Sequence, residues 1–239
     1  MRQAQQAFGH AMSFKRYAIY FVPAPGPFSH FGNGWLGWDA VSGTIPPVPD
    51  VGGLAADRAE ITATPRKYGL HATIKPPFRL ADGASPDALN DALAAFCADS
   101  APVMLDGLEI ARLGSFLALV PSGECAGINE LAARAVKELD QLRAPLTDGE
   151  KAKRRTSRLS PVQQRLLDQW GYPYVMEEFR FHITLTGKLP RSLRDNVRDV
   201  LHRNLDHLLP CPFPVGALSL VGEGQDGMFR VVRSHALRG

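Results

Sequence analysis

The sequence predicts an α+β fold with two pseudo-symmetric lobes, each an antiparallel sheet with helices on its outer face, around a central cleft. A chain of 239 residues that is 45% hydrophobic is long enough to bury a substantial core. The order strand, helix, β-hairpin occurs twice, and each copy begins with a strand that contains a His-x-Thr motif. We therefore expect residues 1–239 to form a single bilobal domain, with a loose tail over residues 1–15.

An N-terminal strand and a long connection precede the first copy. Residues 16–23 (RYAIYFVP) are rich in aromatic and β-branched residues and end at a proline, which predicts a strand. Residues 24–66 carry many glycines and prolines. We expect an ordered but mostly irregular segment there, in which Trp35 and Trp38 pack against the rest of the protein.

The first copy starts with a strand over residues 70–78, which two prolines end because proline cannot donate to a sheet ladder. Ser85 is placed to cap the next helix, Pro86 fits its first position, and apolar residues recur at helical spacing as far as Phe96. Residues 103–113 and 116–120 predict a hairpin joined at Gly114. A second amphipathic helix is expected over residues 128–142.

A helix that begins with a capping box at Ser160 and stops near Gly171 precedes the second copy. This copy consists of a strand over residues 179–185, a helix over residues 193–208, and a hairpin through residues 217–221 and 228–232. The order of the elements, rather than residue identity, indicates the duplication.

The composition narrows the classes of function. Lys and Arg number 27 against 24 Asp and Glu, so a net charge of +3 gives no general attraction to polyanions, and any anion site must be local. The three cysteines are widely spaced, which favours a reducing, cytoplasmic setting over a disulfide framework or a zinc knuckle. We expect neither secretion nor membrane insertion, and no obligatory protein partner is evident.

The two His-x-Thr strands present polar side chains on one face. Alternate residues of a strand share a face, so the polar faces are predicted to carry His71, Thr73 and Lys75 in the first strand, and Arg180, His182, Thr184 and Thr186 in the second. Imidazoles move protons near neutral pH, hydroxyls donate to phosphoryl oxygens, and a cation offsets their charge. One such motif is weak evidence, whereas two in matched strands indicate a shared phosphate site.

These residues, in the segments YGLHATIKPPF and FRFHITLTG, resemble the two-histidine phosphoesterase superfamily. With RYAIYFVP near the start, the likeness runs from residue 16 to the end and is to a bacterial branch associated with phosphonate-metabolism operons. It implies a bilobal fold, no metal or other cofactor, and hydrolysis or transfer at a cyclic phosphate or a 2′–5′ phosphodiester. It further implies that His71 and His182 are catalytic and that Thr73 and Thr184 bind the substrate.

Several other residues have two interpretations. Lys75 and Arg180 are assigned to the substrate site only because the alternation of side chains along a strand places them on the polar face. Like Thr186, they could instead be solvated and have no substrate role. The basic run Lys151, Lys153, Arg154, Arg155 and Arg158 could bind a nucleotide or RNA backbone, but we favour a solvated, mobile loop. The aromatic residues Tyr17, Tyr20, Trp35 and Trp38 could stack on a base, but we favour packing.

The resulting hypothesis is a metal-independent phosphoesterase that hydrolyses a small cyclic phosphate by paired histidine acid–base catalysis. Its substrate would be a sugar phosphate formed during phosphonate breakdown or a 2′,3′-cyclic nucleotide end. Two histidines could instead be zinc ligands, but spacing indicates no third ligand. The alternative function is a non-catalytic module that binds RNA or a nucleotide in the same cleft. Which histidine is the base and which is the acid stays open.

Overall fold

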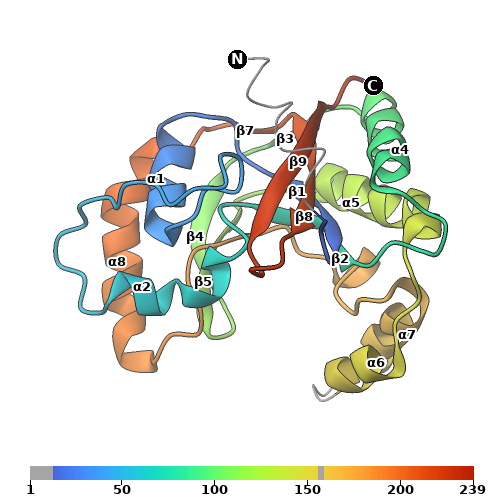
Figure 1. Ribbon diagram of the computed structural model, residues 1–239. Helices are drawn as coiled ribbons and strands as arrows, with labels where there is room; N and C mark the ends of the chain where they lie inside the picture. The colour runs from blue at the N-terminus through green and yellow to red at the C-terminus, as the bar shows by residue number, and fades with distance from the viewer. Residues whose placement is uncertain (1–12, 156–158) are drawn as a thin grey trace.

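The computed structural model describes residues 13–155 and 159–239 and has the predicted α+β architecture (Figure 1). Its strands are β1 (Tyr17–Phe21), β2 (Ala72–Phe78), β3 (Val103–Leu105), β4 (Leu108–Leu113), β5 (Phe116–Pro121), β6 (Ile183–Thr184), β7 (Phe213–Val215), β8 (Ala217–Glu223) and β9 (Phe229–Ala236). Its α-helices are α1 (Pro27–Leu36), α2 (Arg58–Ile61), α3 (Ala63–Arg66), α4 (Pro86–Ala98), α5 (Ala126–Glu138), α6 (Asp148–Arg155), α7 (Pro161–Trp170) and α8 (Arg194–Leu205). Short 3₁₀ turns are η1 (Asp140–Leu142), η2 (Met176–Glu178), η3 (Arg191–Leu193) and η4 (Asp206–Leu208).

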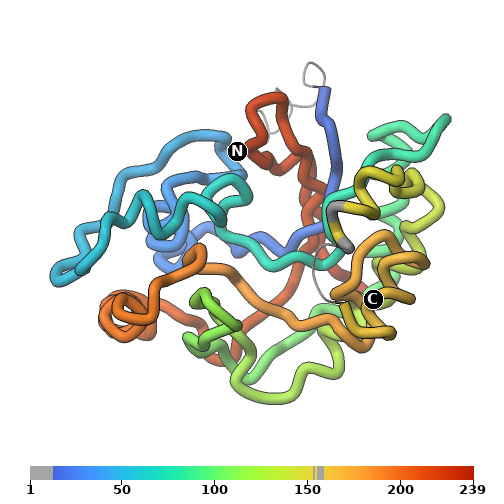
Figure 2. The backbone as a smooth tube through the Cα atoms, turned by 90° about the horizontal axis from the view of Figure 1, so that it is seen from below, coloured from blue at the N-terminus to red at the C-terminus, as the bar shows by residue number. Residues whose placement is uncertain are grey.

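The two strands that carry the histidine motifs lie side by side in the middle of the main sheet. The strand order is β4-β5-β6-β2-β1-β8-β9, and every neighbouring pair is antiparallel. Ala72 of β2 is opposite Ile183 of β6, and this pair joins the two halves of the sheet. In Figure 2 the teal chain of β2 and the orange chain of β6 pass side by side through the middle of the molecule. A separate ladder pairs β3 with β7.

The duplicated order is present as β2-α4-β3-β4-β5 and β6-α8-β7-β8-β9. Each copy gives its hairpin to the other: β4–β5 extends the sheet from β6, and β8–β9 lies beyond β2 with β1 between them. Each helix packs on the hairpin of the other copy: α4 contacts β8 and β9, and α8 contacts β4. Each half of the sheet therefore contains chain from both copies.

The helices cover one face of the sheet and leave the other face for the site. The main core combines inward residues of both halves with α1, α4, α5 and α8. On the opposite face a smaller cluster contains Ala18, Tyr20, Val221 and Phe229. The histidine motifs belong to this second face, so the sheet itself separates the core from the site.

The segment 24–66 is more regular than predicted, since it contains α1, α2 and α3. Pro27 starts α1 and Gly37, with a φ of 79°, ends it. The glycines inside α1 lower helix propensity but allow close packing: a Cβ at Gly32 would lie 2.5 Å from Leu70 Cδ2. The indole of Trp35 donates to the Leu185 carbonyl at 2.8 Å, so α1 holds the residues beside both histidine motifs.

Two predicted strands are shorter than expected. Residues 103–113 form β3 and β4 in different sheets, with a break after Leu105. Residues 179–185 are a regular strand only at Ile183 and Thr184. The Arg180 carbonyl accepts a hydrogen bond from the His182 ring, and Leu185 and Thr186 both donate to the Leu117 carbonyl, so the chain leaves the ladder on either side.

The prediction of a mobile loop for the basic run is wrong for residues 151–155, which lie in α6. Glu150 accepts hydrogen bonds from the Thr147 amide and hydroxyl, an arrangement that caps the start of a helix. Arg158 lies outside the described residues. At the N-terminus, Phe14 packs edge-on against Tyr17 and Lys15 donates to the Glu223 carbonyl, so this part of the predicted loose tail is held against the sheet; residues 1–12 lie outside the described range.

Candidate active site

The register of β2 and β6 brings the two motifs together. Because Ala72 is opposite Ile183, the residues on either side place His71 opposite Thr184 and Thr73 opposite His182. Opposed side chains in an antiparallel pair have Cβ atoms about 5 Å apart and point to the same face. The predicted His71, Thr73, His182 and Thr184 therefore form one polar group on the face away from the main core.

Both imidazoles are oriented in the same way. His71 Nδ1 lies 2.9 Å from the Gly69 carbonyl oxygen, and His182 Nδ1 lies 2.8 Å from the Arg180 carbonyl oxygen. A carbonyl oxygen only accepts, so each Nδ1 carries the hydrogen and each Nε2 is left for the site. The same contact with the second residue upstream occurs in both motifs, which fixes two imidazoles in matching orientations.

Gly69 gives the first orienting carbonyl its direction. Its φ of +71° is in the left-handed region, which favours glycine. A Cβ there would also lie 3.2 Å from the Ala40 side chain and 3.3 Å from the Ala40 amide nitrogen. The conformation and the close packing together explain why a glycine stands two residues before His71.

His71 is the more enclosed of the two histidines. Its exposed fraction is 9%; the Tyr20 ring lies against it with centroids 4.0 Å apart, and the Tyr68 ring is 5.5 Å away. Burial lowers the pKa of His71 to about 4, the Gly69 contact opposes that change, and nearby His182 lowers it further. Thr73 Oγ1 lies 3.2 Å from Nε2, so a neutral His71 accepts the Thr73 hydroxyl hydrogen.

His182 lies in a more open environment. It is half-buried, and the nearest aromatic ring is that of Phe116, whose centroid is 6.1 Å from that of the imidazole. The site therefore combines one enclosed, neutral imidazole with one that reaches solvent more freely. Such a difference in environment separates the roles of two otherwise identical groups.

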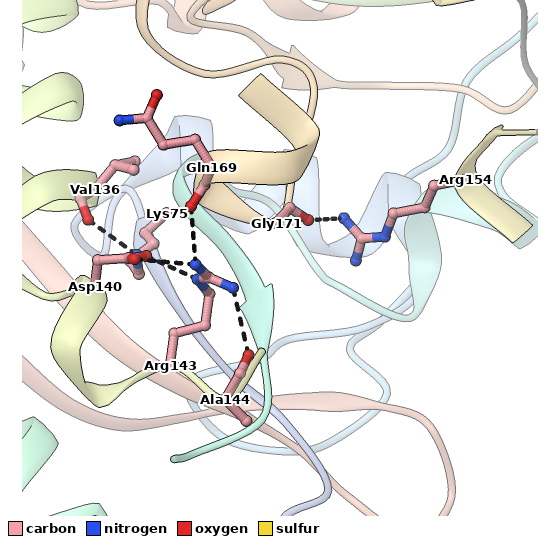
Figure 3. Close-up of polar contacts among 8 residues, drawn as sticks. All are labelled: Lys75, Val136, Asp140, Arg143, Ala144, Arg154, Gln169 and Gly171. Atoms are coloured by element: carbon pink, nitrogen blue, oxygen red, sulfur yellow. Dashed lines mark hydrogen bonds and ion pairs between the residues drawn. The ribbon is translucent and has the colours of Figure 1, made fainter. Parts of the chain in front are cut away.

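Lys75 does not join this polar group. A register shift in the β1–β2 ladder follows Thr73, and the Lys75 ammonium is directed toward α5, where it donates to the Val136 carbonyl at 3.0 Å and to Asp140 at 3.1 Å (Figure 3). Its exposed fraction of 2% also rules out the solvated alternative. Burial lowers the pKa of Lys75 to about 8, and Asp140 opposes the change.

Thr186 and Arg180, which strand alternation also placed on the polar face, do not direct their polar side-chain groups to the histidines in the structure. The Thr186 hydroxyl is buried and used within the backbone, where it accepts from the Leu117 amide and donates to the Gly187 carbonyl. Arg180 is exposed, and its carbonyl rather than its guanidinium contacts His182. Strand alternation misplaced Lys75 and Thr186 because the regular ladder is interrupted beside each motif.

Several residues at the site carried no clear signal in the sequence. Packing is confirmed for Tyr17, Trp35 and Trp38, but Tyr20 also covers His71. Tyr68 and Phe116 flank the two histidines, and each could have been noticed only as an aromatic residue close to a motif or at a strand start. Their positions depend on how distant strands pair.

In residues 13–155 and 159–239, no group of three or more His, Cys, Asp and Glu side chains is arranged to hold a metal ion. Nor does any helix in them have the length and apolar character needed to cross a membrane.

The α+β fold and the adjacent position of the two His-x-Thr strands agree with the arrangement that the sequence resemblance implied. The chain belongs to the family described as "Protein of unknown function (DUF1045)", which matches residues 73–230. The match begins two residues beyond His71.

Two curated relatives are named "Ribose 1,5-bisphosphate phosphokinase PhnN". The one from Janthinobacterium sp. (strain Marseille) is 38% identical over 90% of this chain and 49% of its own length. The one from Laribacter hongkongensis (strain HLHK9) is 40% identical over 91% of this chain and 51% of its own length. The chain thus spans about half the length of these relatives. Among solved structures, that of E. coli LigT complexed with NADP+ is 13% identical, with a TM-score of 0.44 over 95% of this chain and 99% of that one.

Proposed function

We propose that the protein is a phosphoesterase that hydrolyses a small cyclic phosphate, with His71 and His182 as the acid–base pair. The observation that carries the proposal is the matched orientation of the two imidazoles. Each Nδ1 is held by a carbonyl two residues upstream, and both Nε2 atoms are left for one face of adjacent strands. This is the arrangement that concerted proton transfer at a single phosphorus requires.

We assign the general base to His71 and the general acid to His182. Burial lowers the pKa of His71, so its Nε2 is unprotonated at neutral pH and can take up a proton once the Thr73 hydroxyl turns to the substrate. His71 removes a proton from water as the water oxygen bonds to phosphorus, and the phosphorus–oxygen bond of the ring breaks. Protonated His182 gives its Nε2 proton to the departing oxygen. Thr73 and Thr184 donate to the non-bridging oxygens and stabilise their charge.

The names of the relatives point to a ribose derivative as the substrate. Both relatives are named as ribose 1,5-bisphosphate phosphokinases, and this chain corresponds to about half of each. Opening a cyclic phosphate on ribose yields a ribose phosphate, so a hydrolase of this kind would supply a phosphorylated ribose to such a kinase. We therefore favour a ribose cyclic phosphate formed in phosphonate metabolism over a nucleotide or an RNA end.

A substrate panel with a chelator present throughout tests the proposal. It should contain ribose 1,2-cyclic phosphates, 2′,3′-cyclic nucleotides and 2′–5′-linked dinucleotides. We expect turnover of a cyclic phosphate that survives chelation, because the chemistry uses imidazoles and fixed donors. Binding of a nucleotide or RNA without turnover would favour the binding-module alternative. Activity that appears only when zinc or manganese is restored would contradict the metal-independent mechanism.

A further inference from the structure

A pocket with an excess of positive charge lies beside the histidine site, between the end of β2 and the α6–α7 segment. The empty space along its walls, including the part that belongs to open solvent, is about 420 Å³. Its polar and aromatic walls include Lys75, Arg79, Arg143, Arg154, Trp170 and Tyr172. In Figure 1 the α6–α7 segment forms a separate corner of the molecule, so this wall is not part of the duplicated framework.

Three of the four cations are neutralised by carboxylates. Lys75 and Arg143 share Asp140, with the Arg143 guanidinium donating to both carboxylate oxygens at 2.7 and 2.9 Å. Arg79 pairs with Glu150 at 3.2 Å. The contacts of Lys75 and Arg143 with Asp140 form the cluster at the left of Figure 3. The role of all these contacts is to hold β2, η1 and α6 together.

Arg154 is different from these three cations. Its guanidinium donates to the Gly171 carbonyl at the end of α7, apart from the Asp140 cluster (Figure 3), and lies 5.3 Å from the centre of the Tyr172 ring. No carboxylate of the described residues lies within ion-pair distance of it. Burial lowers the pKa of Arg154, Tyr172 and the carboxylate of Glu150, which is already paired with Arg79, oppose the change, and Arg16 and Arg143 add to it. The fold therefore holds a half-buried cation next to other cations, and an anion bound there would offset that cost.

Tyr172 connects this pocket with the histidine site. Burial raises the pKa of its phenol, Arg154 opposes that change, and Tyr68 adds to it. Tyr68 in turn lies against His71. Along β2, the pocket wall at Pro76 is three residues from Thr73, a distance of roughly 10 Å for an extended strand. A sugar phosphate can span that interval.

We propose that Arg154 binds a second phosphate group of the substrate, distal to the cyclic phosphate on which His71 and His182 act. The inference rests on the proposed function and adds the substrate class: a cyclic phosphate of a sugar that also carries a phosphomonoester. The guanidinium nitrogens of Arg154 that do not bind Gly171 donate to this group, and Tyr172 forms the wall between the two phosphates.

A pair of substrates tests this assignment. We compare ribose 1,2-cyclic phosphate with its 5-phosphorylated form, using the unmodified protein, Arg154→Gln and the control Arg165→Gln. Arg165 is exposed on α7, pairs with Glu177 and lies outside the pocket. Loss of a charge-assisted hydrogen bond should lower kcat/KM for the 5-phosphorylated substrate about 10- to 100-fold in Arg154→Gln, mainly through KM. The other substrate and the control should change less than about threefold. Equal losses on both substrates would overturn the proposal.

A binding measurement separates this proposal from the proposed function. Calorimetry with ribose 5-phosphate, in competition with inorganic phosphate, reports on the pocket even if no cyclic phosphate is turned over. Weaker binding of ribose 5-phosphate to Arg154→Gln, with unchanged binding to Arg165→Gln, supports the subsite. Unchanged binding to Arg154→Gln overturns it. If inorganic phosphate binds as tightly as ribose 5-phosphate, the pocket recognises a free anion rather than a substrate group, and the proposal is again overturned.

Discussion

The carbonyl of Gly69 accepts the His71 Nδ1 hydrogen because the chain at residue 69 is left-handed, with a φ of +71°. At the scale of single residues, the site therefore depends on backbone as much as on side chains. The His71 and His182 motifs could be found in the sequence because a motif is a local pattern. The carbonyls that orient the imidazoles could not, because they depend on backbone angles beside the motif.

Gly69→Ala should reduce both stability and activity. The left-handed conformation costs a residue with a Cβ about 1–2 kcal/mol, and the new methyl group would press on Ala40. Gly83→Ala is a matched control, because Gly83 has a φ of +80° but open space around it. We expect the left-handed conformation to lower the free energy of unfolding by a similar amount in both variants, as measured by urea unfolding. Only Gly69→Ala should also lower kcat, by about tenfold or more, because it moves the carbonyl that orients His71. Equal kcat values for the two variants would show that this carbonyl has no such role.

The pH dependence should reflect the burial of His71. The lowered pKa, about 4, means that the free protein keeps His71 neutral down to that pH, whereas an exposed histidine is protonated below about 6.5. The acid limb of kcat/KM should therefore fall near pH 4. Bound phosphate favours the imidazolium, so the acid limb of kcat should lie at higher pH than that of kcat/KM. A kcat/KM limb at pH 6.5 or above would contradict the assignment of His71 as base.

At the scale of elements, the Lys75–Asp140–Arg143 cluster joins β2 to the end of α5. Strand alternation predicted a substrate role for Lys75, and the irregular register after Thr73 turned the side chain into the protein instead. The helix starts at Ser85 and Ser160 were predictable because caps are local signals, and both serines accept the expected backbone amide. The α1 helix was missed because its glycines oppose helix formation, and only the close approach of Leu70 to Gly32 and of Pro47 to Gly34 explains them.

Removing the carboxylate and removing the ammonium of this cluster should lower the free energy of unfolding by different amounts. Asp140→Asn leaves buried Lys75 and Arg143 without their shared carboxylate and should lower the free energy of unfolding by about 2–4 kcal/mol. Lys75→Met removes the buried charge, and Asp140 still pairs with Arg143. The free energy of unfolding should therefore fall by less than about 1.5 kcal/mol. Urea unfolding of both variants measures the difference. A larger loss in Lys75→Met than in Asp140→Asn would show that the ammonium stabilises the fold in some other way.

At the scale of the whole molecule, the duplicated order of elements was visible in the sequence, and the α+β class followed from it. The exchange of hairpins between the copies was not visible. It depends on which distant strands pair, as when β8 pairs with β1 across some 200 residues of sequence, and no local pattern specifies such a contact. The same arrangement places β2 beside β6, so the strand pairing that sets the overall topology also brings the two histidines together.

The measurement that tests the central proposal most directly is a double-mutant cycle on His71 and His182. The kcat for the best cyclic phosphate, with a chelator present, is compared among the unmodified protein, His71→Ala, His182→Ala and the double variant. If the two imidazoles act together on one phosphorus, each single substitution should lower kcat about a hundredfold or more, and the double variant should be little slower than the slower single variant. Losses that multiply in the double variant, or near-normal turnover in either single variant, would contradict paired acid–base catalysis.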